Sequence, residues 1–279
     1  MRILFTAPNE HLRHLEYPGI TWGWQDGVYD AWVCDPLKPV TRPLLELTGV
    51  RYLATPSTGT NHIDLEACKD LNIKVFSLLD NREKLNCIKA SSEFTFWLIL
   101  SALRLGGFRQ WKHYDRNDDF MRGNELYGKK VGLIGYGRIG KNVARYCQAF
   151  GAEWDYYDPA HKKYGNVKRM FKSDIVVICC SLTEETRGMI KDELDGFEGI
   201  LVNTARAEII DEAALLKWTE KGRYATDVLH GEVQGITDSP LLHRSNVIVT
   251  PHIAGTTYES QEKAARIVLD LLEEYERTV

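Results

Sequence analysis

Short apolar runs alternate with helix-like segments over most of the chain. In the first part, the runs have the length and composition of strands, and segments such as residues 65–71 lie between them. The predicted strands cover residues 2–6, 31–34, 52–54 and 75–77. A longer helical pattern follows over residues 90–104. Strands that alternate with helices indicate a parallel sheet.

A second alternating series begins near residue 130. Its predicted strands cover residues 131–134, 153–157, 175–179, 200–203, 224–227 and 247–249. Its predicted helices cover residues 139–150, 211–221 and 259–276, and the last of these carries an apolar stripe. The pattern therefore predicts two α/β units, of which the second has the more regular order of strand, loop and helix.

The composition narrows the class of protein. The chain has 279 residues, of which 44% are hydrophobic and 27% charged, as in an ordinary globular protein with a substantial core. The net charge of −4 gives no general attraction to nucleic acid or to an anionic membrane surface. No stretch approaches the ~20 apolar residues that span a bilayer. The N-terminal segment turns polar too early for a secretory signal, so we expect a cytoplasmic protein.

The cysteines do not have the spacing of a metal site. Only one pair is adjacent, and there is no C-x-x-C motif. Neighbouring cysteines on a strand point to opposite faces, which makes chelation of one metal difficult. We therefore predict no metal, and reduced thiols at Cys34, Cys68, Cys87, Cys147, Cys179 and Cys180.

The strongest local motif is a glycine-rich loop between a predicted strand and a predicted helix. Gly135, Gly137 and Gly140 form the pattern G-x-G-x-x-G. The first glycine permits a tight turn, the second lets the backbone approach a pyrophosphate, and the third lets the helix pack closely on the strand. The start of the helix attracts the anion. The motif predicts dinucleotide binding; the alternatives are a simple glycine-rich turn or another nucleotide-like ligand.

An acidic residue follows at the spacing that a ribose contact requires. Asp158 ends the next predicted strand, eighteen positions after Gly140. A carboxylate there accepts hydrogen bonds from the adenosine ribose and repels a 2′-phosphate, so NAD is favoured over NADP. Asp155 is the rival for this role, and the cations at residues 161–163 could weaken the preference.

Three later apolar runs each end in a polar group that suits one reaction. Arg206, Glu232 and His252 follow predicted strands, and ligands of open α/β sheets bind at strand ends. A guanidinium binds a carboxylate, and a histidine moves a proton near neutral pH. These are the needs of a 2-hydroxyacid and its 2-oxoacid. Taken singly, each residue could instead be structural: a strand-end histidine, a surface ion-pair partner and a solvated acid.

Several segments together resemble one enzyme family. They are STGTNHIDLEAC (residues 57–68), SSEFTFWLILSALR (91–104), GLIGYGRIG (132–140), NTARAEIIDE (203–212), residues 227–232 and TPHIAGTT (250–257). In this order they are similar to the D-isomer-specific 2-hydroxyacid dehydrogenases, the phosphoglycerate dehydrogenase-like group. The resemblance covers most of the chain.

The resemblance implies the fold and its division. We expect two Rossmann-like, doubly wound parallel-sheet domains with a cleft between them. Residues 1–103 with 258–279 would form the substrate domain, and residues 104–257 the NAD-binding domain. A homodimer built mainly through the NAD-binding domain is also implied.

The resemblance also implies the reaction and its catalytic residues. The enzyme would interconvert a small D-2-hydroxyacid and its 2-oxoacid with NAD(H). Arg206 matches the arginine that binds the substrate carboxylate and polarises its carbonyl group. His252 matches the general acid and base, and Glu232 the carboxylate that orients the imidazole.

Further contacts follow from the same motifs. Thr58 and Gly59 match the loop whose backbone amides receive the substrate carboxylate. His62 and His230 lie near these motifs but are expected to be structural. The cofactor contacts implied are Arg138 and Ile139 at the pyrophosphate, Asp158 at the ribose, Asp227 at the nicotinamide carboxamide, and Cys180, Thr204, Ala205, Ala254 and Gly255 from neighbouring loops.

The chain departs from the family pattern in a few places. Ala207 stands where a glycine usually follows the arginine, and Ser181 and Val233 replace common prolines. The chain is shorter than most members, mainly in the first unit, which leaves the substrate undefined. Arg82 or Lys84 could meet an anionic substrate tail or be solvated surface charges.

Two other functions fit parts of the sequence. An NAD(H)-sensing binding protein, like the corepressors of the same fold, would use the cofactor loop without catalysis. A methyltransferase that uses S-adenosylmethionine would share the glycine loop. Loss of Arg206, Glu232 or His252 would have favoured the binding protein, and all three are present; in the methyltransferase the set has no role, so the dehydrogenase is favoured.

Overall fold

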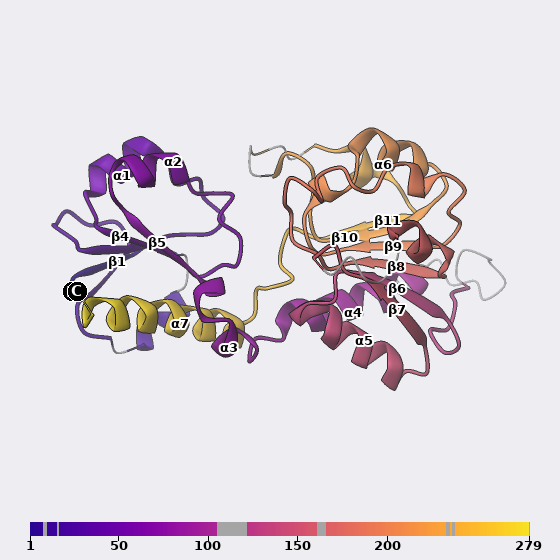
Figure 1. The fold of residues 1–279 in the computed structure, drawn as a ribbon, viewed down its shortest axis with the longest axis horizontal. Coiled ribbons are helices and arrows are strands. Elements are labelled where there is room, and N and C mark those ends of the chain that lie inside the picture. The colour runs from indigo at the N-terminus through magenta and orange to yellow at the C-terminus, as the bar shows by residue number, and fades with distance from the viewer. Residues whose placement is uncertain are drawn as a thin grey trace, which may run out of the picture. The chain divides into compact units, whose positions relative to one another are not determined.

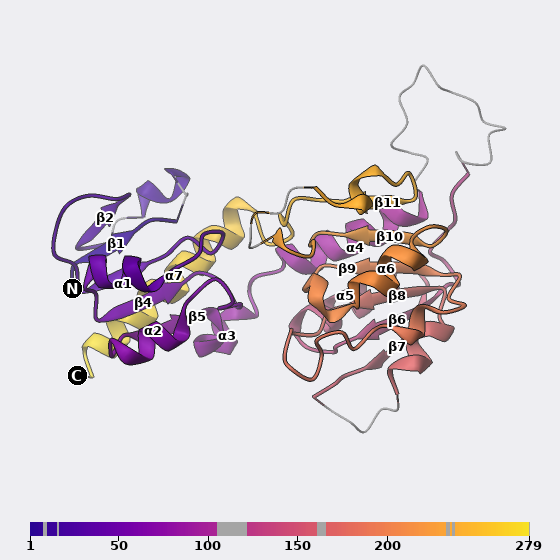
Figure 2. The same ribbon diagram turned by 90° about the horizontal axis from the view of Figure 1, so that it is seen from above.

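The chain forms two compact units, which are described separately. The computed structural model describes residues 1–7, 10–15, 17–104, 122–160, 166–232, 235 and 238–278. Unit 1 comprises Met1–Ile88 with Thr256–Val279, and unit 2 comprises Lys89–Gly255. Figures 1 and 2 show the elements of each unit.

Unit 1 contains a parallel sheet of five strands in the order β2-β1-β3-β4-β5. Helices α1 and α2 cover one face, and α7 covers the other (Figure 1). The strands are β1 (Ile3–Phe5), β2 (Ile20–Trp22), β3 (Ala31–Val33), β4 (Tyr52–Thr55) and β5 (Lys74–Ser77). The helices are α1 (Arg42–Thr48), α2 (Leu65–Asp70), α3 (Arg82–Leu85) and α7 (Tyr258–Glu276).

The side-chain alternation of the strands builds two apolar layers in unit 1. Ile3 and Phe5 face the α7 side, where Val268 of α7 is fully buried, whereas Leu4 faces the side of α1 and α2. The sheet is therefore buried on both faces, as parallel sheets require. Thr257 begins α7, because its hydroxyl accepts a hydrogen bond from the Ser260 amide at 3.1 Å.

Unit 2 contains a parallel sheet of six strands in the order β11-β10-β9-β8-β6-β7. Helices α4 and α5 pack on one face and α6 on the other (Figure 1). The strands are β6 (Lys130–Ile134), β7 (Glu153–Tyr157), β8 (Ile175–Ile178), β9 (Ile200–Asn203), β10 (Arg223–Thr226) and β11 (Val247–Val249). The helices are α4 (Ala90–Leu103), α5 (Arg138–Ala149) and α6 (Glu212–Trp218).

Short 3-10 helices connect many of these elements. They are η1 (Glu10–His14), η2 (Leu78–Asn81), η7 (Val167–Lys172), η8 (Asp192–Leu194), η9 (Ala207–Ile209) and η11 (Pro240–His243). Among the described helices, none has the length and apolar character that crossing a bilayer requires.

The strand order of unit 2 reverses at one point. After β6 the chain forms α5 and adds β7 on one side, and the next strand, β8, pairs with β6 on the other side. Ligands of open α/β sheets bind where the order reverses, beyond the carboxyl ends of the strands. This geometry places the glycine loop after β6 at the expected binding edge.

The predicted fold class, two α/β units with parallel sheets, is confirmed. The unit boundary differs from the expected one at α4, which was predicted to lie in the substrate domain. In the structure α4 packs against α5 and against β9 and β10, so it lies in unit 2.

Candidate active site

The glycine loop has the geometry that a dinucleotide pyrophosphate needs. Gly135 has a φ of +100°, and a Cβ there would lie 2.5 Å from the Cys180 amide nitrogen. A Cβ on Gly140 would lie 2.2 Å from the Gly135 carbonyl oxygen, so the helix can approach the loop only with glycine. By contrast, among the described residues no heavy atom outside Gly137 and its neighbours in the chain lies within 4 Å of the Cβ position at Gly137.

The glycine loop leads directly into a helix. Gly137 is the N-cap residue of α5 and has no side chain with which to cap it. Arg138 and Ile139 are its first residues. The amides at a helix N-terminus and the helix dipole together favour an anion at this point. The residues present therefore fit the pyrophosphate of NAD.

Asp158 lies beside this loop. It is buried, and its carboxylate accepts hydrogen bonds from the amides of Tyr136 at 3.1 Å and Ala160 at 2.9 Å. The rival Asp155 lies within β7 and forms an ion pair with Arg169. Of the two carboxylates, the one predicted for the ribose is thus bonded to the glycine loop. The cations at residues 161–163 lie outside the described residues.

The structure brings Glu232 and His252 together. The His252 Nδ1 and a Glu232 carboxylate oxygen lie 2.7 Å apart, and the second oxygen accepts the Leu229 amide at 3.0 Å. Among the described residues, no group bonds the other ring nitrogen, Nε2. The two side chains follow β10 and β11, which are neighbours in the sheet, so the pair lies at its carboxyl edge.

The surroundings of Glu232 favour its charged form. Burial raises its pKa, but the hydrogen bond and charge of His252, the Leu229 amide and the charge of Arg206 together lower the pKa below its ordinary value. Glu232 is therefore a carboxylate at neutral pH and can stabilise a protonated imidazole.

Arg206 is held by the loop that follows β9. Its Nη1 donates to the Ala205 carbonyl at 2.7 Å. The fully buried Asn203 organises the loop: it accepts the Ala205 amide at 2.9 Å and donates to the Arg206 carbonyl at 3.1 Å. Asn203 was not among the predicted site residues, because a polar residue at a strand end gives no signal of such a role.

Asp227 fixes the turn that carries His252. It is 1% exposed, and its two oxygens accept hydrogen bonds from the Thr250 hydroxyl at 2.5 Å, the Ile253 amide at 2.9 Å and the Ala254 amide at 2.7 Å. The bonded groups lie before and after His252 in the sequence. His252 has a φ of +55°, which is unfavourable for a residue with a side chain. Asp227 thus offsets the strain of the histidine, and its contact with the nicotinamide carboxamide stays a prediction.

The other predicted cofactor residues lie along the same edge of unit 2. The Thr204 hydroxyl lies 2.6 Å from the hydroxyl of Thr95, a buried residue of α4 that sequence reasoning missed. Cys180 and Ala254 are buried, and Gly255 is exposed. Their contacts with a cofactor stay predictions.

The other candidate residues lie in unit 1, except His230 of unit 2, whose ring is hydrogen-bonded to a backbone carbonyl. Thr58 is exposed in the loop after β4, where the Gly59 amide donates to the Ser57 hydroxyl at 3.1 Å. His62 is buried 3.1 Å from the Thr55 hydroxyl. His230 of unit 2 bonds the Ile210 carbonyl. Both histidines are therefore placed as structural residues.

Lys84 is engaged within unit 1. Its ammonium lies 2.8 Å from Asp270 and 3.7 Å from Glu274, both on α7. These ion pairs argue against a role for Lys84 in binding an anionic substrate tail. Within the described part of the chain, no group of three or more His, Cys, Asp or Glu side chains is placed to hold a metal ion.

Two protein-family models match the chain. Residues 96–254 match the NAD-binding domain of the D-isomer specific 2-hydroxyacid dehydrogenases. Residues 25–83 match the catalytic domain of the same family.

Curated relatives match most of the chain. The hydroxypyruvate reductase of Thermotoga maritima is 33% identical over 267 residues, which cover 88% of this chain and 83% of that protein. The glyoxylate/hydroxypyruvate reductase HPR3 of Arabidopsis thaliana is 30% identical, with 86% and 77% covered. The D-3-phosphoglycerate dehydrogenase of Bacillus subtilis is 32% identical over 85% of this chain, which spans only 47% of that protein.

Solved structures have the same fold. The D-lactate dehydrogenase of Lactobacillus jensenii with NAD⁺ is 26% identical, with a TM-score of 0.73 over 97% of this chain and 95% of that one. The apo D-lactate dehydrogenase of Escherichia coli has a TM-score of 0.80 at 22% identity, covering 100% and 98%. At that identity the second likeness shows the fold alone.

Proposed function

The chain belongs to the D-isomer specific 2-hydroxyacid dehydrogenases, a family of NAD-dependent enzymes, and we propose that it reduces a small 2-oxoacid to the D-2-hydroxyacid. The observation that carries this proposal is the contact of 2.7 Å between His252 and an ionised Glu232, at the sheet edge that also holds Arg206 and the glycine loop.

Each residue has a role that follows from its chemistry. NADH, when bound, supplies the hydride. Arg206 binds the substrate carboxylate through its planar guanidinium. His252, held at Nδ1 by Glu232, donates a proton from Nε2 to the carbonyl oxygen, and Glu232 stabilises the imidazole in its protonated form. In the oxidative direction the neutral imidazole accepts the hydroxyl proton.

The finer identity of the substrate is proposed from unit 1 and from the relatives. We propose that the amides of Thr58 and Gly59 also receive the substrate carboxylate. Relatives are named as reductases of glyoxylate and hydroxypyruvate. The test is NADH oxidation with glyoxylate, pyruvate, hydroxypyruvate, phosphohydroxypyruvate and bulkier 2-oxoacids. Turnover of at least one is expected, and turnover of none would contradict the proposal.

Asp158 is expected to set the preference for NADH. Asp158→Asn removes the charge that repels a 2′-phosphate, so we expect the preference for NADH over NADPH in kcat/KM to fall by about tenfold, equal to about 1.4 kcal/mol. Asp155→Asn is the matched control and should leave this ratio unchanged. The role is refuted if the ratio changes in the control and not in Asp158→Asn.

Glu232→Gln is expected to alter the pH dependence of reduction. The pKa of Glu232 in the folded protein is lower than the ordinary pKa of glutamate. The side chain is therefore charged above the ordinary pKa, and it loses this stabilising charge only as the pH falls through its lower pKa in the folded protein. Without the charge, protonated imidazole is less favourable, so the alkaline limb of kcat/KM should move to lower pH. At neutral pH the rate should fall by roughly 10² to 10⁴-fold.

The control for this prediction is His230→Gln, in the same loop. His230 bonds only a backbone carbonyl among the described residues, so its replacement should leave the alkaline limb in place. An unchanged limb in Glu232→Gln would show that the carboxylate does not support the acid.

We also propose that the protein is cytoplasmic and a homodimer. All six cysteines are free, which fits a reducing compartment. Aromatic side chains on and near α4 and α5 are exposed, with Trp97 at 42%, Tyr127 at 76% and Phe150 at 53%. A second copy of unit 2 would cover them. Light scattering should give about twice the chain mass of 31.9 kDa, and the single mass would contradict the dimer.

A further inference from the structure

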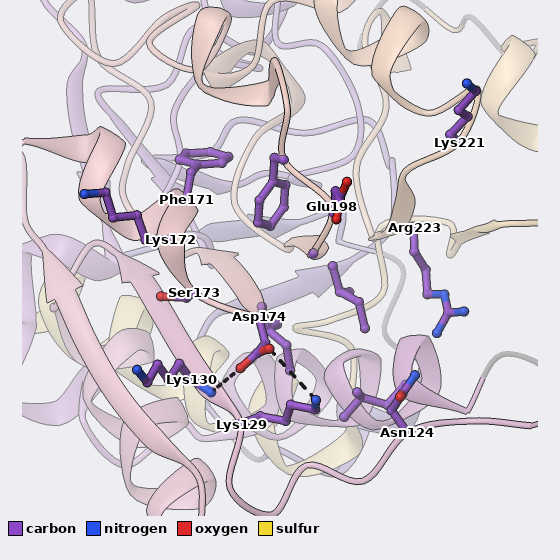
Figure 3. A pocket seen from close by; sticks show the side chains of 15 residues that line it. Asn124, Lys129, Lys130, Phe171, Lys172, Ser173, Asp174, Glu198, Lys221 and Arg223 are labelled. Atoms are coloured by element: carbon purple, nitrogen blue, oxygen red, sulfur yellow. Dashed lines mark hydrogen bonds and ion pairs between the residues drawn. The ribbon is translucent and has the colours of Figure 1, made fainter.

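A cavity lies at the end of the unit 2 sheet where its strands begin, opposite the carboxyl ends that lead to the candidate active site. Its volume is about 820 Å³, within the range of small-molecule sites. The lining includes the first residues of four neighbouring strands: Lys130 of β6, Ile175 of β8, Ile200 of β9 and Arg223 of β10 (Figure 3). Arg206, Glu232 and His252 follow the carboxyl ends of strands in this same parallel sheet. The cavity is therefore distinct from the candidate active site.

Positive charge predominates around the cavity. Five of the lining residues are basic and two are acidic, although the chain as a whole carries a net charge of −4. The basic residues are Lys129, Lys130, Lys172, Lys221 and Arg223, and the acidic residues are Asp174 and Glu198. Cations gathered in a concave surface concentrate anions there.

Little of this positive charge is neutralised within the protein. Asp174 accepts the backbone amide of Lys130 at 2.8 Å and lies 3.9 Å from the Lys129 ammonium, as the dashed lines in Figure 3 show. Within the described residues, no carboxylate pairs with the ammonium groups of Lys130, Lys172 or Lys221. These three cations are available to a ligand.

Aromatic rings form part of the lining. Phe171 and Phe197 meet edge to face with ring centres 5.1 Å apart. Phe197 stacks on Trp218, whose indole N–H donates to the Phe197 carbonyl at 2.8 Å. The Arg223 guanidinium is held by a hydrogen bond of 3.2 Å to the Ala102 carbonyl. The lining is thus mainly polar, with Phe171 and the largely buried Phe197 as its aromatic part.

We propose that this cavity binds a small molecule that carries two or more phosphate groups. The phosphates would lie at the cations, and any ring of the ligand would lie against Phe171 and Phe197. Phosphate chemistry fits better than a single carboxylate, because the cations come from several elements around one space and a multiply charged anion can contact several at once. The inference does not depend on the proposed reaction.

The test is isothermal titration of the whole protein with inorganic tripolyphosphate and, separately, with magnesium-free ATP. Both titrations are made without NADH, because NADH itself carries two phosphate groups and would compete at the cavity; binding that the cavity variant below loses is assigned to the cavity and not to the glycine loop. The variant is Lys172→Glu with Lys221→Glu. The matched control is Lys69→Glu with Lys74→Glu, two exposed lysines of unit 1 that give the same change in net charge.

We expect both probes to bind the wild type and the control, and the affinity to fall at least tenfold in the cavity variant. Higher salt should weaken binding further. Tighter binding of ATP than of tripolyphosphate would show that the rings contact the ligand, and equal binding would show that the phosphates alone are recognised. The proposal is overturned if neither probe binds the wild type, if the cavity variant binds as well as the wild type, or if both variants lose affinity equally.

Discussion

Replacing His252 with asparagine is expected to lower kcat for reduction of the best 2-oxoacid by about 10² to 10⁴-fold. Asparagine is the suitable replacement because the φ of His252 is +55°, and asparagine tolerates this left-handed conformation better than most residues. Its amide can still donate to Glu232, so the turn should persist. What is lost is a group able to give a proton to the carbonyl oxygen.

The measurement compares steady-state kinetics with folding and cofactor binding. The KM for the oxoacid and the affinity for NADH should change little, since neither depends on the proton. His230→Asn is the control, and its turnover should stay near that of the wild type. If His252→Asn kept more than about a tenth of the wild-type kcat, the assignment of the acid would be wrong.

Replacing Arg206 with lysine is expected to lower kcat/KM for the oxoacid by about 10²-fold, or about 2.7 kcal/mol. Lysine keeps the charge but loses the planar pair of donors that holds a carboxylate with two hydrogen bonds. The charge near Glu232 is also kept, so the pH dependence should change little. Much of the loss should therefore appear in the KM for the oxoacid.

Arg187→Lys is the control for this substitution, because Arg187 is an exposed arginine in unit 2. The readout is kcat and KM for the oxoacid, with NADH affinity measured separately. Unchanged kcat/KM in Arg206→Lys would exclude Arg206 as the carboxylate-binding residue.

The parts of the site that could be predicted share one property. The glycine loop, Glu232 and His252 each lie in the segment that follows a strand, and parallel strands bring their carboxyl ends to one edge. The order of strands and polar residues predicted that Arg206, Glu232 and His252 lie at one sheet edge, and the resemblance to the family predicted that Glu232 pairs with His252. Asp158 could be distinguished from Asp155 because only Asp158 lies beyond the end of β7.

The parts that could not be predicted depend on contacts between distant loops. Asp227 bonds a turn more than twenty residues away, and Thr95 reaches Thr204 from a helix. Three elements of unit 1 were also missed, namely β2, α1 and α3. Strand β2 has no buried residue, and α1 and α3 each bury one, so their sequences carry little hydrophobic pattern.

The structure also explains why alanine is tolerated after the arginine. Ala207 is buried at the start of η9. Of the described non-glycine residues, only Asn72 and His252 have a positive φ, so Ala207 does not need the conformational freedom of glycine. The departure from the family pattern therefore leaves the backbone that carries Arg206 unstrained.

Hydride transfer from NADH to the 2-oxoacid can be followed with NADH deuterated at the position of the transferred hydrogen. The protein is incubated with this cofactor and the best 2-oxoacid of the panel, and the hydroxyacid is analysed by mass and by chiral separation. The account predicts one deuterium on the carbon next to the carboxylate, in the D-isomer, and no product from His252→Asn above the residual rate. Product without deuterium, or the L-isomer, would contradict it.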